Sequence, residues 1–498
     1  MTQPIEPTHA PEIDLDPKDW GEFSSIAHRA VDDMVALLRD VRDEPPWRPV
    51  PAEIAHRFRT EIPHQGTDLG AVYEQIRETV LPYRTGNIHP RFWGWVMGNG
   101  TAEGMLADFV ASAMNNHLAG YDQSAARIER QVIRWLLEIM GYPAEGSGIL
   151  VSGGTVANLN GIAVARKAKA DWDVREEGLA GGPPLRFYGS DQTHSWADKA
   201  ADLLGLGRRG FVRVASDDQG RVDLSALARV VEQDRRQGLR PFCVVGTAGT
   251  VNYGAIDDLE ALADFCERED LWFHIDGAFG ALLAFHPELK PLIQSVERSD
   301  SVAFDLHKWG YLQYELGCTL VRDAETHRRT FASSADYLKA PGRGIQPEAL
   351  DLSELGIQLS RGFRALKVWT SFQVHGIDRI GQVIAQNVDQ AAYLADRIES
   401  ETDLEQTAPR PLNIVCFRFH PSGLGEERLD EINREILVRL QEDGIAIPSS
   451  TLIDGRFSLR VAITNHRTTR ADLDLLVAST LGIGRELLGA CAEVYETR

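Results

Sequence analysis

Short apolar runs alternate with stretches of helical periodicity through the middle of the chain. The apolar runs are LRFYGS, FVRVAS, PFCVVGTAG, LWFHIDG, SVAFDL and GCTLVRD, which lie between residues 185 and 323. Runs of this length separated by helices are typical of a mainly parallel sheet with helices on both faces. Ligands of such sheets bind at the carboxyl ends of the strands, so we expect the functional site there.

Helical patterns precede this region. Apolar positions recur at helical spacing from Trp20 to Leu38, and the pattern breaks at the proline-rich DEPPWRPVP. A second helical stretch covers Leu69 to Val80. These two helices form no core of their own, so we expect them to pack on another part of the protein or on a second subunit.

The C-terminal part of the chain has its own pattern of helices and strands. A long helix around SRGFRALKVWTSFQVHG is followed by a helix, the strand-like runs NIVCFRF and FSLRVAI, and a last helix. We therefore expect a small α/β domain here, because 498 residues are too many for one compact unit. The predicted parts are an N-terminal helical arm (1–85), a large domain (86–376) and a small C-terminal domain (377–498).

Composition narrows the class of ligand. The net charge of −21 opposes binding to nucleic acid or to an anionic membrane, so we expect a small-molecule substrate. Five scattered cysteines without metal-like spacing indicate a reducing compartment, no disulfide framework and no metal. The acidic, proline-rich N-terminus is unlike a signal peptide, and the sequence lacks an apolar run of membrane-spanning length. We expect a cytoplasmic protein.

Polar groups follow strand after strand at the same edge of the predicted sheet. Ser152, Gly153, Gly154 and Thr155 follow GILV, and later strands are followed by His194, Thr247, Asp276, His307 and Lys308. One ligand that needs all of these groups is pyridoxal 5′-phosphate (PLP). It carries an aldehyde that reacts with amines, a ring nitrogen that a carboxylate keeps protonated, and a phosphate.

Each of these residues alone also has an ordinary explanation. An apolar site would push Lys308 towards the neutral, nucleophilic amine, whereas a strand that simply ended here would point it into solvent. Asp276 could serve the ring nitrogen or cap a helix. His194 could lie flat against the ring or make local hydrogen bonds. The glycines of SGGTVANLNG could bring backbone N–H groups to a phosphate, or form a tight turn. Their joint occurrence, in this order, favours the cofactor.

Ten motifs together resemble the PLP-dependent group II amino-acid decarboxylases, the family of aromatic L-amino-acid decarboxylase. They are NIHPRFWGW, MLADF, SGGTVANLNGIAVAR, SDQTHSWADKA, GTAGTVNYGAIDDL, LWFHIDGAFG, DLHKW, YLK, RGFRALKVW and LRVAIT, between about Leu81 and Thr464. The resemblance implies a fold-type I (aspartate aminotransferase-like) architecture with a mainly parallel seven-stranded sheet. It also implies a homodimer with the active site at the interface and the N-terminal arm wrapped around the partner.

The resemblance also implies roles for individual residues. Lys308 looks like the lysine that forms a Schiff base with PLP, Asp276 like the partner of the ring nitrogen, and His194 like the ring-stacking histidine that contacts the substrate carboxylate. Together with His307 these are the expected catalytic residues. The expected cofactor contacts are Gly153, Gly154, Thr155, His194, Thr247, Asp276, Ala278, Asp305, His307 and Lys308. The expected substrate pocket contains Trp93, Trp95, Tyr314 and Leu352.

The implied reaction is decarboxylation of an L-amino acid, with an aromatic one expected, to the amine and CO2. The chain departs from its relatives at Leu352, where the loop motif Asp351-Leu352 has leucine in place of the tyrosine that commonly protonates Cα. Oxygen-dependent formation of an aldehyde is therefore an alternative, unless another tyrosine or His194 donates the proton. Gly277 and Asp305 stand where many relatives have alanine and asparagine.

Two further classes stay open. An aminotransferase would need an arginine to grip the α-carboxylate, and Arg460 is a candidate, although related decarboxylases also have an arginine there. A PLP-binding paralogue without activity is the other. The substrate itself stays open as well, because glutamate, aspartate and diaminobutyrate decarboxylases share the same cofactor residues.

Overall fold

The computed structural model describes residues 13–332, 343–345 and 352–496. Residues 1–12, the YLK motif at 337–339 and Asp351 lie outside the described residues. The chain groups into two units, residues 13–44 with 48–85 and residues 45–47 with 86–496, and each is described by itself. Our three domain limits stay predictions.

The N-terminal unit consists of helices. They are α1 (Trp20–Arg39), η1 (Val41–Asp43), α2 (Ala52–Arg57), α3 (Leu69–Thr79) and η2 (Leu81–Tyr83). Asp19 caps α1 by accepting hydrogen bonds from the backbone N–H groups of Gly21 and Glu22. The hydroxyl of Tyr73 on α3 donates to Asp33 on α1 over 2.7 Å, which joins the two helices. Both predicted helices are thus present.

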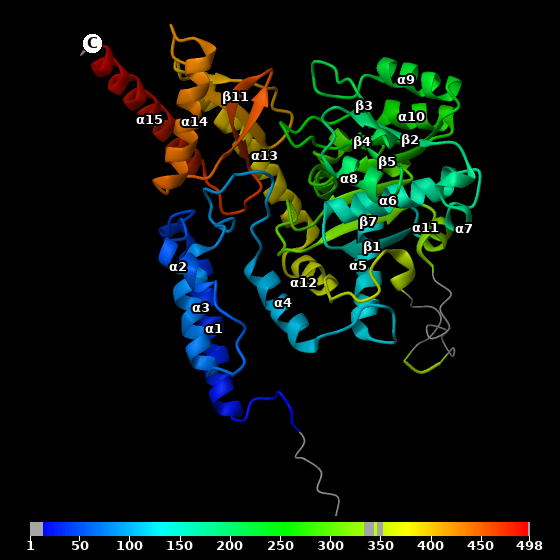
Figure 1. Cartoon of the computed structure of the whole chain (residues 1–498), viewed down its shortest axis with the longest axis horizontal. Coiled ribbons are helices and arrows are strands. Elements are labelled where there is room, and N and C mark those ends of the chain that lie inside the picture. Colours follow the sequence, from blue (N-terminus) through cyan, green and yellow to red (C-terminus); the bar gives the residue numbers. More distant parts are fainter. Residues whose placement is uncertain (1–12, 333–342, 346–351, 497–498) are drawn as a thin grey trace, which may run out of the picture. The chain divides into compact units, whose positions relative to one another are not determined.

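The larger unit is built on a seven-stranded sheet (Figure 1). Its strands are β1 (Ser147–Val151), β2 (Leu185–Ser190), β3 (Phe211–Val214), β4 (Arg240–Thr247), β5 (Trp272–Asp276), β6 (Ser301–Asp305) and β7 (Gly317–Val321). They lie in the order β1-β7-β6-β5-β4-β2-β3. Strand β7 runs antiparallel to both of its neighbours, and the others are parallel to one another. The predicted mainly parallel sheet is confirmed.

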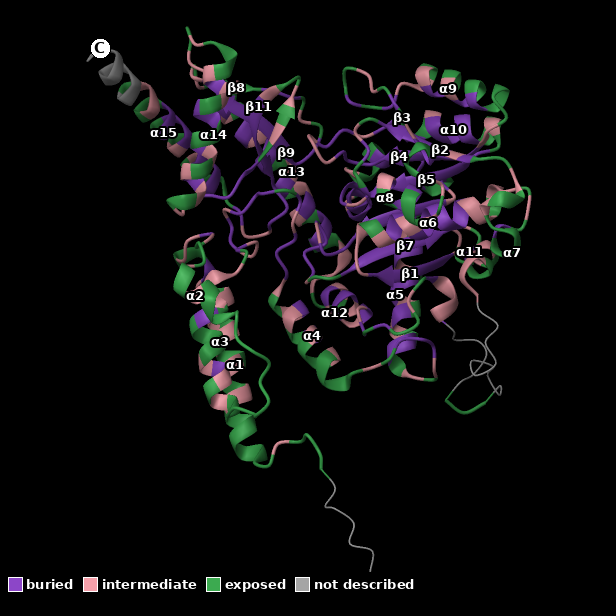
Figure 2. Ribbon diagram, in the orientation of Figure 1, coloured by how far each residue is buried: buried purple, intermediate pink, exposed green. Residues whose placement is uncertain are grey.

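Helices cover both faces of this sheet. The helices of this region are α4 (Ala102–Met114), α5 (Ser124–Met140), α6 (Gly154–Lys169), α7 (Val174–Glu177), α8 (Trp196–Leu203), α9 (Leu224–Arg236), α10 (Leu259–Glu269), α11 (Ala324–Phe331) and α12 (Ala365–His375). Short 3-10 turns are η3 (Leu179–Gly181), η4 (Arg208–Gly210), η5 (Gly280–Phe285), η6 (Lys290–Ile293), η7 (Val296–Arg298) and η10 (Leu352–Leu355). Helices α6 and α8 pack on one face, and α5, α9, α10 and α12 contribute to the core on the other. Figure 2 shows buried strands between helices whose outer sides are exposed.

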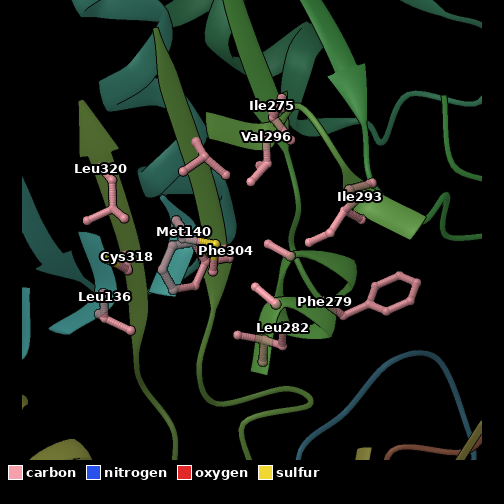
Figure 3. Packing of buried hydrophobic residues seen from close by; sticks show 14 of the residues in the cluster. Leu136, Met140, Ile275, Phe279, Leu282, Ile293, Val296, Phe304, Cys318 and Leu320 are labelled. Atoms are coloured by element: carbon pink, nitrogen blue, oxygen red, sulfur yellow. The ribbon is translucent and has the colours of Figure 1, made fainter. Parts of the chain in front are cut away.

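The main core lies between α5, the sheet and η5. Figure 3 shows Leu136 and Met140 of α5 beside Cys318 and Leu320 of β7. Cys318 and Leu320 are two positions apart on a strand and therefore point to the same face. Burial of this apolar surface is the main force that holds the sheet and thus the ends of its strands in place.

The C-terminal part carries a second, antiparallel sheet with strand order β10-β11-β9-β8. Its elements are α13 (Ile377–Glu399), β8 (Leu404–Gln406), β9 (Ile414–Phe419), α14 (Glu426–Glu442), β10 (Ser449–Ile453), β11 (Arg456–Ala462) and α15 (Arg470–Glu496). The predicted small α/β layer is therefore present. Among the described residues, we find no helix with the length and apolar character that crossing a membrane requires.

One predicted helix starts later than expected. The sequence pattern predicts a long helix around SRGFRALKVWTSFQVHG, and within this stretch α12 begins only at Ala365. The Arg361 side chain is buried before that point and forms a salt bridge of 2.8 Å with Glu129 on α5. Its guanidinium also donates to the carbonyl oxygens of Leu118 and Leu150. These contacts account for the extended chain ahead of α12.

Candidate active site

The loops at the carboxyl ends of the strands surround a cavity of about 530 Å³. All ten residues that we expected around PLP line this cavity: Gly153, Gly154, Thr155, His194, Thr247, Asp276, Ala278, Asp305, His307 and Lys308. They come from the ends of β1, β4, β5 and β6 and from the loop after β2. The structure thus brings together residues that are up to 155 positions apart (308 minus 153).

The loop after β1 leads directly into α6. A Cβ atom at Gly154 would lie 2.7 Å from Asp305 Oδ2, and one at Gly153 would lie 3.2 Å from His307 Cε1. A larger residue at position 154 would therefore collide with Asp305 at the end of β6, and one at position 153 would press on the ring of His307. Because both positions are glycine, the first turn of α6 lies close to the cavity, where its backbone N–H groups can serve an anion.

The Lys308 side chain forms an ion pair with Asp305. Its Nζ lies 3.0 Å from Asp305 Oδ2, and the carboxylate is almost wholly buried whereas the lysine side chain is 23% exposed. The alternative that Lys308 simply points into solvent is therefore wrong.

His307 lies on the other side of the same carboxylate. Its Nδ1 accepts a hydrogen bond of 3.0 Å from the backbone N–H of Leu316, and its Nε2 lies 3.8 Å from Asp305 Oδ2. Burial lowers the pKa of His307, although Asp305 partly opposes this shift. The imidazole is therefore neutral at pH 7, and the ring of Tyr314 stacks on it at a centroid distance of 4.3 Å.

Asp276 ends β5 and is 3% exposed. Its Oδ2 accepts from Trp196 Nε1 over 2.6 Å, and its Oδ1 accepts from the Ala278 backbone N–H and from Asn158 Nδ2 over 3.1 and 3.4 Å. The contact with Ala278 is the local hydrogen bond of a turn, and Asp276 caps no helix, because η5 begins at Gly280 with Phe279 before it. All three donors are uncharged. A buried carboxylate with only neutral donors fits a cationic partner such as a protonated ring nitrogen.

His194 lines the cavity beside Asp276. Burial lowers the pKa of His194, and the charge of Asp276 partly opposes this, so the ring is neutral at pH 7. Its Nδ1 accepts from the Trp196 backbone N–H over 3.2 Å, which is the local hydrogen bond that the sequence also allowed. This bond helps to fix the orientation of the ring.

Two buried polar atoms in this cavity lack protein partners. Within the described residues, neither Thr247 Oγ1 nor Asp305 Oδ1 has a hydrogen-bond partner. Thr247 itself is well held, because its backbone N–H donates to Asp257 over 2.7 Å. Buried polar atoms without partners are costly, so these two atoms mark places where a polar ligand fits.

The expected substrate pocket is only partly present. Trp95 and Tyr314 line the cavity, whereas Trp93 and Leu352 do not. Trp93 belongs to the core of the C-terminal sheet, and its Nε1 donates to Thr468 Oγ1 over 3.1 Å. Leu352 is 3% exposed and packs in the main core. Both are thus core residues of this chain.

Arg460 does not line the cavity either. Its guanidinium donates to the backbone carbonyls of Asn252 and Trp95 over 2.9 and 2.8 Å, and also to that of Val251. Burial lowers the pKa of Arg460 to about 10, which still leaves it charged at pH 7. An arginine that is committed to backbone carbonyls cannot also grip a substrate carboxylate, so the aminotransferase alternative loses its candidate.

Sequence reasoning missed two residues that contact Asp276. Asn158 lies four positions after Gly154, one turn along α6, and Trp196 lies two positions after His194. The helical spacing of Asn158 from the glycine loop was a signal that could have identified it. The tryptophan gave no such signal, because a tryptophan near the start of a helix is usually a core residue.

Comparison with known proteins adds an independent result. The family model of the pyridoxal-dependent decarboxylase conserved domain matches residues 51–420. The aromatic-L-amino-acid decarboxylase of Bacillus atrophaeus is 33% identical over 474 residues, which cover 94% of this chain and 96% of the relative.

Two solved structures are similar in fold. The crystal structure of Oryza sativa TDC with PLP and tryptamine has a TM-score of 0.87 at 26% identity and covers 95% of this chain and 100% of that one. The glutamate decarboxylase domain of a transaminase and L-2,4-diaminobutyrate decarboxylase from Vibrio parahaemolyticus has a TM-score of 0.83 at 26% identity, with coverage of 95% and 98%.

Proposed function

Because this chain belongs to the pyridoxal-dependent decarboxylase family, we propose that it converts an aromatic L-amino acid to its amine and CO2. It is a PLP-dependent carboxy-lyase with a fold-type I architecture. The observation that carries the proposal is the single cavity in which Lys308, Asp276 and His194 meet.

The residues of the cavity fit PLP. Lys308 would hold its aldehyde carbon, Asp276 its ring nitrogen and His194 the face of its ring. The backbone N–H groups at Gly154 and Thr155 would hold its phosphate. Bound PLP supplies an electron sink for the charge that develops at Cα when CO2 leaves. The free Thr247 Oγ1 supports this fit, since it offers an unused hydroxyl to the ligand.

The chain's own side chains set the conditions for decarboxylation. Val96, Phe279 and Trp95 line the cavity together with the charged residues, so part of its wall is apolar. An apolar wall excludes water and disfavours the charged carboxylate relative to neutral CO2.

An aromatic substrate suits the side chains at this wall. The rings of Trp95, Phe279 and Tyr314 line the cavity, and aromatic rings pack favourably on one another. The relative from Bacillus atrophaeus is an aromatic-L-amino-acid decarboxylase, and the Oryza sativa structure contains tryptamine. Both support the choice of an aromatic amino acid over an acidic one.

We also propose a homodimer whose N-terminal arm contacts the partner. Helix α4 exposes Leu106, Phe109, Val110 and Met114, which recur at helical spacing and are 41–58% exposed. Figure 2 shows α4 as largely exposed. An apolar helix face of this kind supports burial against a second copy.

A cytoplasmic location is supported by four cysteines that are free and buried: Cys243, Cys266, Cys318 and Cys416.

A product assay tests the activity. Purified protein with PLP is given aromatic and acidic L-amino acids in air, and CO2, amine, aldehyde and hydrogen peroxide are followed together. We expect CO2 and amine in equal amounts from an aromatic substrate, and none from the Lys308→Ala variant. Equal amounts of CO2, aldehyde, ammonia and peroxide would instead identify oxygen-dependent aldehyde synthesis, and absence of CO2 from every substrate would refute decarboxylation.

A further inference from the structure

A row of buried side chains connects the core of the large sheet with Asp276. Trp272 Nε1 donates to Ser301 Oγ over 2.8 Å, and Ser301 Oγ lies 2.8 Å from His274 Nδ1. On the other side of its ring, His274 Nε2 lies 2.8 Å from Asn158 Oδ1. The amide nitrogen of Asn158 in turn donates to Asp276 Oδ1 over 3.4 Å. Four hydrogen bonds thus join Trp272 to the carboxylate.

The chemistry of the partners determines the direction of every bond in this row. Asn158 Nδ2 faces two acceptors, the Gly154 carbonyl at 2.8 Å and Asp276, so its Oδ1 faces His274. An amide oxygen only accepts, and therefore His274 Nε2 carries the hydrogen. Nδ1 is then bare and accepts from the Ser301 hydroxyl, whose oxygen accepts from the Trp272 N–H, a group that can only donate.

All four bonds therefore donate in the same direction and end on the Asp276 carboxylate. Hydrogen bonds arranged in this way polarise one another and strengthen. His274 is 0% exposed, and burial lowers its pKa to about 4, so the ring remains neutral. The ring fits between β5 and α6 because residue 161 is glycine, since a Cβ there would lie 2.4 Å from His274 Cε1.

We propose that His274 is a positioning residue for the reaction, which holds the Asn158 amide with its NH2 group towards Asp276. A flipped amide would turn its oxygen to the Asp276 carboxylate and its NH2 group to the His274 N–H, and both contacts would repel. With the amide held, Asp276 keeps a donor on Oδ1 and stays oriented towards the cofactor's ring nitrogen. This inference rests on the proposed role of Asp276.

The test compares two substitutions of His274 with a matched control. His274→Phe fills the site but removes both nitrogens, whereas His274→Gln retains a donor where Nε2 lies. The control is His327→Asn. His327 is also 0% exposed and lies 2.9 Å from a serine hydroxyl, that of Ser147, and burial also lowers its pKa to about 4, but it has no contact with this row.

Two readouts need no substrate: the dissociation constant of PLP, and the pH titration of the visible absorbance of bound PLP. We expect His274→Phe to weaken PLP binding about tenfold and to shift the pH titration of the absorbance. His274→Gln should restore most of the affinity and most of the titration. The control, His327→Asn, should bind PLP within twofold of the parent protein. Equal effects of His274→Phe and the control would overturn the proposal. Because PLP is measured alone, a failure of decarboxylation would be seen separately, in the product assay.

If His274→Phe does not fold, the Ser301→Ala variant tests the positioning role of His274 instead. It removes only the hydroxyl that donates to His274 Nδ1, and so frees the ring to carry its hydrogen there instead. We expect a smaller shift of the titration in the same direction. An unchanged titration in Ser301→Ala would then count against the positioning role.

Discussion

Gly154 and Asp305 are packed so closely that no further carbon fits between them. An added Cβ would lie 2.7 Å from Oδ2 and 3.3 Å from Cγ of Asp305. We predict that Gly154→Ala weakens PLP binding about tenfold, because overpacking at a rigid site costs about 1–3 kcal/mol. Fluorescence titration of the apoprotein with PLP measures this.

The chain offers a control for this substitution. Gly482 lies within α15, and a Cβ there would meet no atom within 4 Å. Gly482→Ala should therefore leave PLP affinity unchanged and favour the helix slightly. An equal loss of affinity in both variants would show that the close contact at Gly154 is unimportant.

Single residues also show where sequence reasoning ends. Trp93 and Trp95 are two apart, and in an extended chain such residues face the same side. The resemblance to the family implied that both line the substrate pocket. At Trp95, however, the backbone adopts a φ of +55°, which breaks the extended conformation. The Trp95 ring therefore does not lie on the same side as Trp93, which packs into the core. A turn of this kind at a non-glycine residue gives no signal in the sequence.

At the scale of elements, the buried pair Glu129–Arg361 joins α5 to the segment before α12. Both side chains are at most 1% exposed, and the pair spans 2.8 Å. We predict that Glu129→Ala lowers the free energy of unfolding by about 3–5 kcal/mol, because it leaves the Arg361 charge buried without its partner. Urea unfolding followed by fluorescence measures the loss.

An exposed ion pair provides the comparison. Glu232 and Arg236 form a salt bridge on α9 with side chains that are 63% and 75% exposed. Glu232→Ala should cost less than about 0.5 kcal/mol, since solvent screens this pair. The prediction for Glu129 is wrong if Glu129→Ala has a free energy of unfolding as high as that of Glu232→Ala.

Helix α4 carries the prediction about assembly. Phe109 is 56% exposed in the single chain and lies in the middle of the apolar face. We predict that Phe109→Asp converts a dimer to a monomer and reduces decarboxylation, whereas Phe109→Leu leaves the dimer intact. Analytical ultracentrifugation of both variants measures the mass. A dimer of unchanged affinity in Phe109→Asp would exclude this face from the interface.

Elements were predicted better than the contacts between them. The strands and their order along the chain follow from apolar runs, because a strand buried on both faces must be apolar. The reversed direction of β7 and the late start of α12 do not follow in this way. Arg361 is kept out of the helix by Glu129, which lies 232 positions away, and local periodicity carries no such information.

At the scale of the whole molecule, buried histidines determine the response to acid. Burial lowers the pKa of His274 and His327 to about 4 and that of His466 to about 3. In the unfolded chain they titrate near 6.5, so below that pH the unfolded state binds more protons and stability falls. Each contributes up to about 1.4 kcal/mol per pH unit, or about 4 kcal/mol for the three together.

One carboxyl group acts in the opposite direction. Burial raises the pKa of Asp257 to about 6, so the folded state gains a proton before the unfolded state does. Below pH 6 this offsets about 1.4 kcal/mol per unit, about a third of the histidine effect. We therefore predict that the unfolding temperature of the apoprotein falls between pH 7 and pH 5. Calorimetry measures this, with the exposed His28→Gln variant expected to show the same profile.

The hydrogen bonds from Arg460 to the cavity wall determine when the pocket can form during synthesis of the chain. Arg460 lies on β11 and donates to the carbonyl oxygens of Trp95 and Asn252, which precede it by 365 and 208 positions. A ribosome therefore has to synthesise β11 before this wall receives the support of Arg460. A fragment that ended before β11 would contain Gly154 and Lys308 yet lack the support that Arg460 gives to Trp95, so we expect it to form no finished pocket.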